Sequence, residues 1–419
     1  MIKIVAFCGG RGGNSIICEL LCHPHIRLTT IVNAYDDGRS TGHIRRFFRM
    51  LGPSDIRKNQ LVMMHQSNGQ EAALKSFFQF RFPNPIEHAR AERAIRSIIS
   101  GDKDEFGLLG AISGFDARRH NRLLGYLSSF LENVSLYESV LGEPFPYSDC
   151  SFSNCIYAGA FEIHGRDFGL TVDHVGKLFN MRGETITNSN ENRYLIAIRE
   201  NGLIMNSEAE IVESRANIRI REIYIVERPL SIEEKKNLDE LPVEDKLKYL
   251  QRYSSTPYIN TRCADAIREA DVILYCPGTQ HSSLYPTYMT NGLGALVRTN
   301  HEAMKVFVAN IGEDYETPAY SVSELVEGAL RRLKSSDPEE HPACAYINYV
   351  LANDAFHKAD QLEKYIRHDP TEVERLGIKY VSGDFEEMKN WGKHDGKRLV
   401  RTVLELLDGF DQVRGGWLC

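Results

Sequence analysis

The chain has 419 residues and a formal net charge of -7 at pH 7, with 42% hydrophobic and 26% charged residues. This length fits two or three domains, or one large α/β domain with insertions, and the composition is that of a globular protein. A negative chain argues against a general nucleic-acid binder, which is usually basic. We find no signal peptide and no apolar run of about 18 residues, so we expect a cytoplasmic protein that does not span a membrane.

The predicted elements alternate between strand and helix at both ends of the chain. Near the N-terminus we expect strands over 2–8 and 28–34 and helices over 14–21, 41–50 and 55–64, the last with Ser54 as its N-cap. From residue 261 we expect helices over 262–269, 322–333 and 396–407 and strands over 271–276, 305–311, 346–351 and 378–381. Short apolar runs are typical of strands buried on both faces of a parallel sheet. The pattern therefore predicts a Rossmann-like, doubly wound α/β fold with a mainly parallel sheet.

Two internal regions interrupt this alternation. Residues 70–150 are mostly helical in pattern. Residues 193–226 have strand character with turns, which favours antiparallel or mixed pairing, and the charged stretch 229–252 indicates solvated helices. We therefore predict a single α/β domain over residues 1–419, with a helical insertion at 70–150 and a mixed strand and charged helical insertion at 193–255.

Two predicted strands run into glycine- and hydroxyl-rich turns. CGGRGGNS (8–15) follows the first strand, and CPGTQHSSLYP (276–286) follows the strand at 271–276. Glycines let backbone amides approach a phosphate, and a following helix start adds partial positive charge. The first turn has neither GxGxxG spacing nor the GK[ST] of a P-loop, so a tight structural turn is the alternative. The candidate ligand-binding residues in the two turns are Gly9, Gly10, Gly12, Asn14, Ser15, Gly278, Thr279, Ser282 and Ser283.

An acidic turn lies at the end of the second predicted strand, in NAYDDGRSTGHIRR (33–46). Its adjacent carboxylates, Asp36 and Asp37, could hold Mg²⁺ or accept a ribose or substrate hydroxyl. Arg45 could meet anionic oxygens. GPSDIRKNQ (52–60) adds Asp55, Arg57 and Asn59 after a proline turn. The alternatives are an acidic turn with a solvated basic helix face, and a helix cap with an exposed charge pair.

Taken in order, these motifs resemble one family. GG-x-G, IV-x-x-x-DDG-x-S-x-G-x-x-R and P-x-DIR are followed by SFSNCIYAGAF, EADVILYCPGTQHSSLYP, VFVANI and KHDGKRLVRTVLELL. The set resembles the 2-phospho-L-lactate transferase (CofD-like) family, and within it most closely the gluconeogenesis factor (UPF0052) branch of UDP-sugar-binding proteins. The resemblance covers residues 4–408. The sequence departs from the family at Arg11, where threonine is usual, and at Cys276, which replaces the first glycine of GPGS.

The resemblance implies a Rossmann-like core that binds a nucleoside diphosphate derivative. Its transferase members move a phospholactyl group from a lactyl-diphospho-guanosine donor to a deazaflavin alcohol with Mg²⁺, whereas its regulatory members resemble binders of UDP-N-acetylglucosamine without established chemistry. We therefore expect a Mg²⁺-dependent transferase of phosphorus-containing groups or a non-catalytic nucleotide-sugar regulator, and leave open whether the chain is an enzyme. Such a transferase works through positioning and charge neutralisation.

On this basis we assign roles to the candidate residues. Asp36, Asp37 and Arg57 are the predicted catalytic residues, with Asp37 as the metal ligand. The resemblance adds four residues to the ligand-binding set: Ser40, Gly42, Asn154 and Asn310. The expected partner is a nucleoside diphosphate or a nucleotide-sugar. We expect binding to neither nucleic acid nor membranes. A homodimer is a possible oligomeric state.

Overall fold

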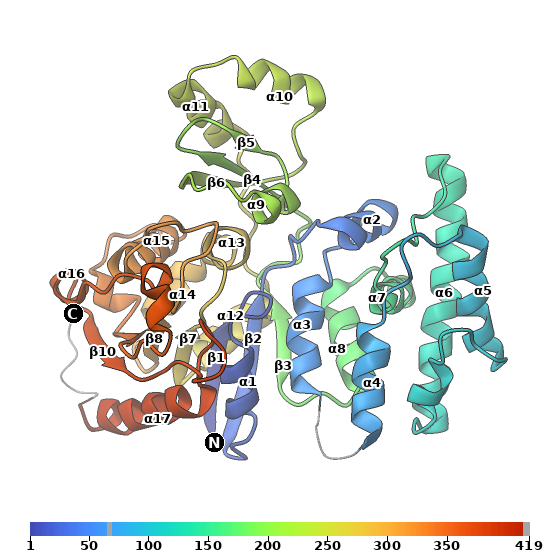
Figure 1. Ribbon diagram of the computed structural model, residues 1–419, viewed down its shortest axis with the longest axis horizontal. Helices are drawn as coiled ribbons and strands as arrows, with labels where there is room; N and C mark the ends of the chain where they lie inside the picture. The colour runs from blue at the N-terminus through green and yellow to red at the C-terminus, as the bar shows by residue number, and fades with distance from the viewer. Residues whose placement is uncertain (65–68, 414–419) are drawn as a thin grey trace. The chain divides into compact units, whose positions relative to one another are not determined.

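A computed structural model describes residues 1–64 and 69–413 of the chain (Figure 1). The chain forms two compact units. Unit 1 combines Met1–Asn33 with Ile186 and all that follows, and unit 2 is Ala34–Thr185. The assignment of the whole chain to a single domain with two insertions stays a prediction.

Unit 1 contains most of a seven-stranded parallel sheet with the order β10-β9-β8-β7-β1-β2-β3. Its strands are β1 (Ile2–Phe7), β2 (Ile26–Val32), β3 (Glu184–Thr187), β7 (Val272–Tyr275), β8 (Met304–Val308), β9 (Tyr349–Asn353) and β10 (Lys379–Gly383). The inner strands are mostly apolar, and Ile4 to Phe7 of β1 are at most 2% exposed. These observations confirm the predicted doubly wound α/β fold with a parallel sheet.

The strand order reverses direction once, between β1 and β7. From β1 the chain adds β2 and β3 towards one edge, and from β7 it adds β8, β9 and β10 towards the other. β1 and β7 pair in parallel, with Phe7 opposite Tyr275, so both strands end at the same level. In open α/β sheets, ligands bind outside the carboxyl ends of the strands at this topological switch point. The loops that follow β1 and β7 are the two predicted glycine turns.

The helices of unit 1 pack in two groups. Helix α1 (Asn14–Leu20) packs on α17 (Gly396–Val413), while α12, α14, α15 and α16 pack on one another in succession. Two groups of this kind are expected when helices cover both faces of a parallel sheet. The other helices and helical turns are α12 (Thr261–Arg268), Gln280–Leu284, α13 (Tyr285–Tyr288), α14 (Leu293–Thr299), α15 (Val322–Ser335), Ala343–Ala345, Ala359–Lys364 and α16 (Pro370–Arg375).

A small antiparallel sheet also belongs to unit 1, drawn in green in Figure 1. Its strand order is β5-β4-β6, with elements β4 (Tyr194–Arg199), β5 (Ile204–Met205), α9 (Glu208–Glu213), β6 (Ile220–Val226), α10 (Ile232–Asp239) and α11 (Val243–Tyr253). Apolar side chains of the sheet and of the two charged helices form one buried cluster, which includes Ile196, Leu238 and Leu250. The mixed strand and charged helical character predicted for this region is confirmed.

Unit 2 is almost entirely helical. Its helices are α2 (Arg39–Phe48), α3 (Ser54–Met63), α4 (Gly69–Gln79), α5 (His88–Ser100), Leu109–Ile112, α6 (Ala117–Leu141), α7 (Phe152–Ile163) and α8 (Phe168–Leu178). The long helix α6 packs closely on α7, where a Cβ on Gly159 would lie 1.7 Å from the carbonyl oxygen of Tyr126. The close approach fixes α7, which begins two residues before Asn154.

Three local expectations differ from the structure. Ser54 is not an N-cap: α3 begins at Ser54 itself, Pro53 holds the cap position, and no side chain caps the helix. Proline before the first turn already sets a helical φ, which explains the earlier start. Helix α8 and strand β3 were not predicted. The segment 277–283, expected as a turn, is partly a π-helical segment, Gln280–Leu284.

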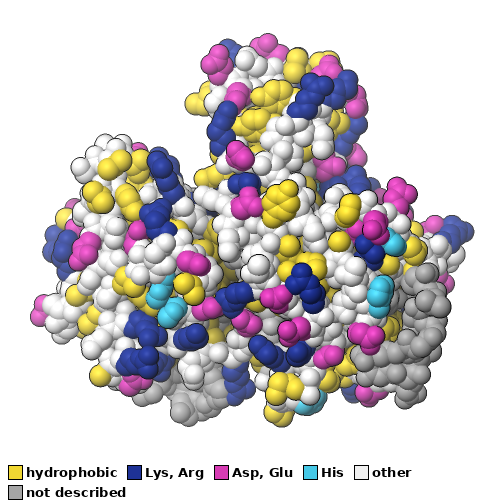
Figure 2. All heavy atoms as spheres, turned by 180° about the vertical axis from the view of Figure 1, so that it is seen from behind, with side chains coloured by type: hydrophobic (Ala, Val, Ile, Leu, Met, Phe, Trp, Pro, Cys, Tyr) yellow, Lys and Arg dark blue, Asp and Glu magenta, His cyan; other side chains and the backbone are white. Residues whose placement is uncertain are grey.

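The surface drawn in Figure 2 carries interspersed basic and acidic side chains, in keeping with a chain of mildly negative charge. Within the described residues, no helix combines the length and the apolar character needed to cross a membrane.

Candidate functional site

The first glycine turn (9–13) and the second glycine turn (277–283) of unit 1 are packed against each other. A Cβ on Gly12 would lie 2.1 Å from the carbonyl oxygen of Pro277, and a Cβ on Gly9 would lie 2.6 Å from Cβ of Ser283. These distances are far shorter than any real Cβ contact, so both positions require glycine. The glycines therefore have a packing role whether or not the turns also hold a phosphate.

Asn310 holds the second glycine turn in shape. Its side-chain oxygen accepts a hydrogen bond from the Gly278 amide at 3.0 Å, and its side-chain nitrogen donates to the Gly278 carbonyl, also at 3.0 Å. Within the turn, the Thr279 hydroxyl donates to that of Ser283 at 2.9 Å. Asn310 follows β8 by two residues, so the strand next to β7 positions the turn at the end of β7.

The side chain of a buried glutamate, Glu316, binds the backbone at the start of the π-helical segment Gln280–Leu284. Its carboxylate accepts hydrogen bonds from the backbone amides of His281 at 2.8 Å and Ser282 at 2.9 Å, and from the Ser282 hydroxyl. Asp314 in turn accepts from the Glu316 amide at 2.8 Å. The protein thus supplies its own carboxyl group to these donors, and the Ser282 hydroxyl has an internal partner. Its assignment as a ligand-binding group stays a prediction.

Burial raises the pKa of Glu316 to about 7, with a further rise from the nearby Asp314 charge, while the hydrogen bonds from Ser282 and His281 oppose the shift. The folded state therefore binds this proton more tightly than the unfolded chain, whose carboxyl has the ordinary value of 4.5. The stability that this group contributes is present below pH 4.5 and is lost as the pH rises through about 7.

We therefore expect the free energy of unfolding of the unaltered protein to fall between pH 4.5 and about 7 relative to that of Glu316→Gln, which cannot ionise. Urea denaturation of both proteins at several pH values measures this difference. If the two proteins keep a constant difference across the range, the assigned protonation of Glu316 is wrong.

The solvent-accessible part of the two turns is polar. Arg11 and Gly12 are exposed, and the half-exposed positions of the predicted set are Gly10, Asn14, Ser15, Gly278, Thr279 and Asn310. Gly9, Ser282 and Ser283 are buried instead. The accessible groups are therefore peptide groups, hydroxyls, amides and one guanidinium, which suit the oxygens of an anionic ligand.

In unit 2, the acidic turn (36–38) is held by its own neighbours. The Asp36 carboxylate accepts from the Gly38 amide at 2.9 Å. Arg45, only 1% exposed, donates to the carbonyl oxygens of Tyr35 at 2.8 Å and Asp36 at 3.3 Å. A Cβ on Gly42 would lie 2.3 Å from the Asp37 carbonyl oxygen. Arg45 and Gly42 thus shape the backbone of this turn, and Asp36 and Asp37 remain half-exposed.

The Ser40 hydroxyl links several segments of unit 2. It accepts from the Asn154 side-chain nitrogen at 3.2 Å, from Arg81 at 3.4 Å and from the Ser151 amide at 3.5 Å. The Asn154 oxygen is buried and has no hydrogen-bond partner within the described chain. Two predicted site residues 114 positions apart, Ser40 and Asn154, are therefore brought together.

The three predicted residues of α3 lie on its first two turns. Lys58 pairs with the Asp55 carboxylate at 2.6 Å, and the Asn59 side chain donates to the Asp55 carbonyl at 2.9 Å. The charge of Arg57 lies near the phenol of Tyr157, whose pKa is nevertheless raised by burial. Asp55 and Lys58 do form a charge pair, but Asp55 is buried, whereas the alternative expected an exposed pair. The catalytic role of Arg57 stays a prediction.

Sequence reasoning missed two residues that shape the site in unit 1. Glu316 lies in GEDYETP, after the strand β8, and a carboxylate beyond a parallel strand was the available signal. Asn33, at the end of β2, donates to the Ser283 carbonyl oxygen. Its position directly before the acidic turn could have indicated such a role.

Together, these features define the chain as a doubly wound α/β protein with two interlocked glycine turns at the topological switch point. The family model of 2-phospho-L-lactate transferase CofD matches residues 4–386. The chain belongs to this family, as its motifs indicated.

Named relatives and solved structures agree with this assignment. The chain is 23% identical over 412 residues to a gluconeogenesis factor of Bacillus subtilis (strain 168), covering 96% of this chain and 98% of the relative. A gluconeogenesis factor of Halalkalibacterium halodurans is 22% identical over 412 residues, with 96% of each chain covered. The crystal structure of a member of the UPF0052 family from Bacillus halodurans has a similar fold, with a TM-score of 0.65, 19% identity, and coverage of 96% of this chain and 99% of that one.

Proposed function

We propose that this protein binds a nucleoside diphosphate derivative at the carboxyl ends of β1 and β7. The observation that carries the proposal is the coincidence of the topological switch point with the two glycine turns. Ligands of doubly wound sheets bind at such a point, and glycine-rich turns allow backbone amides to approach a diphosphate. Membership of the CofD family supports the same class of ligand.

In this proposal the exposed peptide groups of the first glycine turn and those around Gly278 contact the diphosphate. Thr279 and Asn14 add side-chain hydrogen bonds, and Arg11 supplies the positive charge. Asn310 and Glu316 act as positioning residues, because their side-chain hydrogen bonds fix the second glycine turn. A ligand of two negative charges or more would be stabilised by this combination of dipoles and a guanidinium.

We further propose that the chain is a transferase of phosphorus-containing groups. The half-exposed carboxylates of Asp36 and Asp37 are the oxygen ligands that Mg²⁺ prefers, so the acidic turn fits the cofactor that the family implies. When bound there, Mg²⁺ would supply positive charge to the reaction. Asp37 is the proposed metal ligand, Asp36 orients the acceptor hydroxyl, and Arg57 stabilises negative charge.

A second function is a non-catalytic nucleotide-sugar regulator. It is favoured by the names of the relatives, which are gluconeogenesis factors matching over nearly their whole length. In that case the same two glycine turns would bind the ligand without turnover.

A thermal-shift panel tests the shared part of both functions. UDP, GDP and UDP-N-acetylglucosamine are each added to the full chain with and without Mg²⁺. A ligand at 100 times its dissociation constant should stabilise the fold by about 2.7 kcal/mol. The absence of a shift with every nucleoside diphosphate would contradict both functions. Mass spectrometry of ligand that co-purifies with the chain would identify the base.

Asp37→Asn separates the two functions. If the chain is a transferase, we expect turnover to fall by about 100-fold or more, as when one electrostatic contact to a transition state is lost. Nucleotide binding without Mg²⁺ should persist. The matched control is Asp102→Asn, at an exposed position outside the predicted site, which should leave turnover unchanged. An unchanged rate in Asp37→Asn would contradict the assignment of Asp37 as the metal ligand. If the chain binds nucleotide but turns over no donor and acceptor, the regulatory function is favoured.

A further inference from the structure

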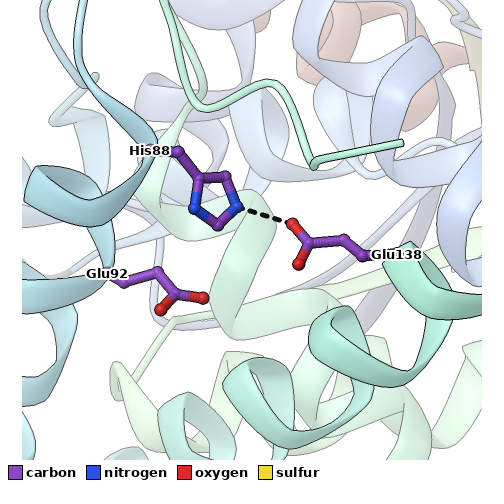
Figure 3. Close-up of side chains that lie close together, drawn as sticks. All are labelled: His88, Glu92 and Glu138. Atoms are coloured by element: carbon purple, nitrogen blue, oxygen red, sulfur yellow. Dashed lines mark hydrogen bonds and ion pairs between the residues drawn. The ribbon is translucent and has the colours of Figure 1, made fainter. Parts of the chain in front are cut away.

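Three potential metal ligands converge in unit 2, and none of them is among the residues assigned above. They are the side chains of His88, Glu92 and Glu138, and their ligand atoms lie within 4.8 Å of one another (Figure 3). Within the described residues, this is the one group of three or more His, Cys, Asp or Glu side chains so closely placed. Each of the three is half-buried.

The helix pattern explains why these residues meet. His88 is the first residue of α5 and Glu92 follows four positions later, so the two share a face of the helix. Glu138 comes from the last turn of α6, which packs on α5. An i, i+4 pair on one helix completed by a side chain of another is a common way to build a metal site within a helical bundle.

Glu138 is held in a defined orientation. One of its oxygens lies 2.6 Å from Nε2 of His88 and accepts a hydrogen bond from the Phe145 amide at 2.7 Å. Backbone hydrogen bonds of this kind orient carboxylate ligands in metal sites. The side chain of Glu138 is 19% exposed, so the pair lies at the edge of the core rather than in open solvent.

A second observation points to a missing group beside these residues. Tyr147 is 2% exposed, and its hydroxyl has no hydrogen-bond partner among the described residues. Its ring centroid lies 5.0 Å from that of His88. Burial is the main cause of the raised pKa of Tyr147, and the charges of Cys155, Glu92 and Glu138 raise it further. A buried hydroxyl without a partner is costly, and a bound water would satisfy it.

One cationic side chain pairs with this group: Arg96 lies 3.5 Å from Glu92, and its side chain is 60% exposed. The two carboxylates and a neutral imidazole form a ligand set of the type that holds Zn²⁺ and similar divalent transition metals. Mg²⁺ favours oxygen ligands and suits this set less well.

We propose that His88, Glu92 and Glu138 bind one divalent transition-metal ion of the zinc type, with a water molecule as its fourth ligand. The Tyr147 hydroxyl hydrogen-bonds to that water. The ion replaces the proton between His88 and Glu138, and it joins the start of α5 to the end of α6. The proposal does not rest on the proposed nucleotide function.

Zinc titration of the full chain tests the proposal. After removal of metals by chelation, isothermal titration calorimetry with Zn²⁺ should show one site per chain. His88→Ala and Glu92→Gln should each weaken that site by about tenfold or more, since even indirect ligand partners contribute this much. The matched control is His341→Ala. His341 also pairs with a glutamate, Glu339 at 2.9 Å, but the two belong to no group of three ligands in the described chain.

The expected result includes a higher melting temperature with Zn²⁺ for the unaltered chain and for His341→Ala, and a smaller rise for the two site variants. X-ray absorption at the zinc edge gives a readout that needs no variant: one nitrogen and three oxygen ligands are expected. Sulfur in the first shell, absence of a stoichiometric site, or equal affinity in Glu92→Gln would each overturn the proposal.

Discussion

Gly12→Ala is expected to destabilise the protein by about 1–3 kcal/mol, the usual cost of forcing extra atoms into a packed site. The added Cβ would lie 2.1 Å from the carbonyl oxygen of Pro277 and 2.8 Å from Cα of Gly278. Both neighbours are backbone atoms at the end of β7, so no side chain can rotate away. The two glycine turns must separate, and we expect nucleotide affinity to fall with stability.

Gly409→Ala is the control for this substitution. Gly409 is an exposed residue of α17 in the same unit, and a Cβ there meets nothing within 4 Å. Alanine should be neutral or should stabilise the helix by about 1 kcal/mol or less. Chemical denaturation followed by circular dichroism measures both effects. If Gly12→Ala is as stable as Gly409→Ala, the two turns do not pack as described.

Gly159→Ala is expected to destabilise the protein at least as much as Gly12→Ala, by about 3 kcal/mol or more, because it also forces extra atoms into a packed site. Here the Cβ would lie 1.7 Å from the Tyr126 carbonyl oxygen and 3.0 Å from the Phe130 amide nitrogen. These are backbone atoms of α6, so α7 would have to move away from it. Because Asn154 lies on α7, its 3.2 Å hydrogen bond to Ser40 should be lost as well.

The control lies in the opposing helix. Gly125 is in α6, and a Cβ on it meets nothing within 4 Å. Replacing a glycine within a helix by alanine stabilises it by about 0.5–1 kcal/mol. Opposite signs for Gly159→Ala and Gly125→Ala, measured by urea denaturation, would support the close helix crossing. Equal effects would contradict it.

The sheet could be predicted because its signal is local. Short apolar runs such as VILY in β7 and MKVFV in β8 are too hydrophobic for an exposed strand, and both became buried inner strands. Strand β3 was not predicted because four residues, ETIT, give too short a pattern to recognise. The strand order could not be predicted either, since it depends on pairing between residues far apart in the chain.

The glycine turns could be located from the sequence. Which of their groups face the solvent and which make internal hydrogen bonds could not be predicted. Composition alone does not distinguish a hydroxyl that faces solvent from one such as Ser282, which donates to the buried Glu316. The role of Asn310 in holding Gly278 depends on the neighbouring positions of β7 and β8. Such long-range contacts separate the positioning residues from the groups left open to a ligand.

The most direct measurement of the central claim is a crystal structure of the full chain grown with UDP or GDP and Mg²⁺. We predict diphosphate density beside the exposed backbone of the first glycine turn and beside Gly278, at the carboxyl ends of β1 and β7. A diphosphate bound elsewhere on the chain, with the two glycine turns empty, would contradict the proposal.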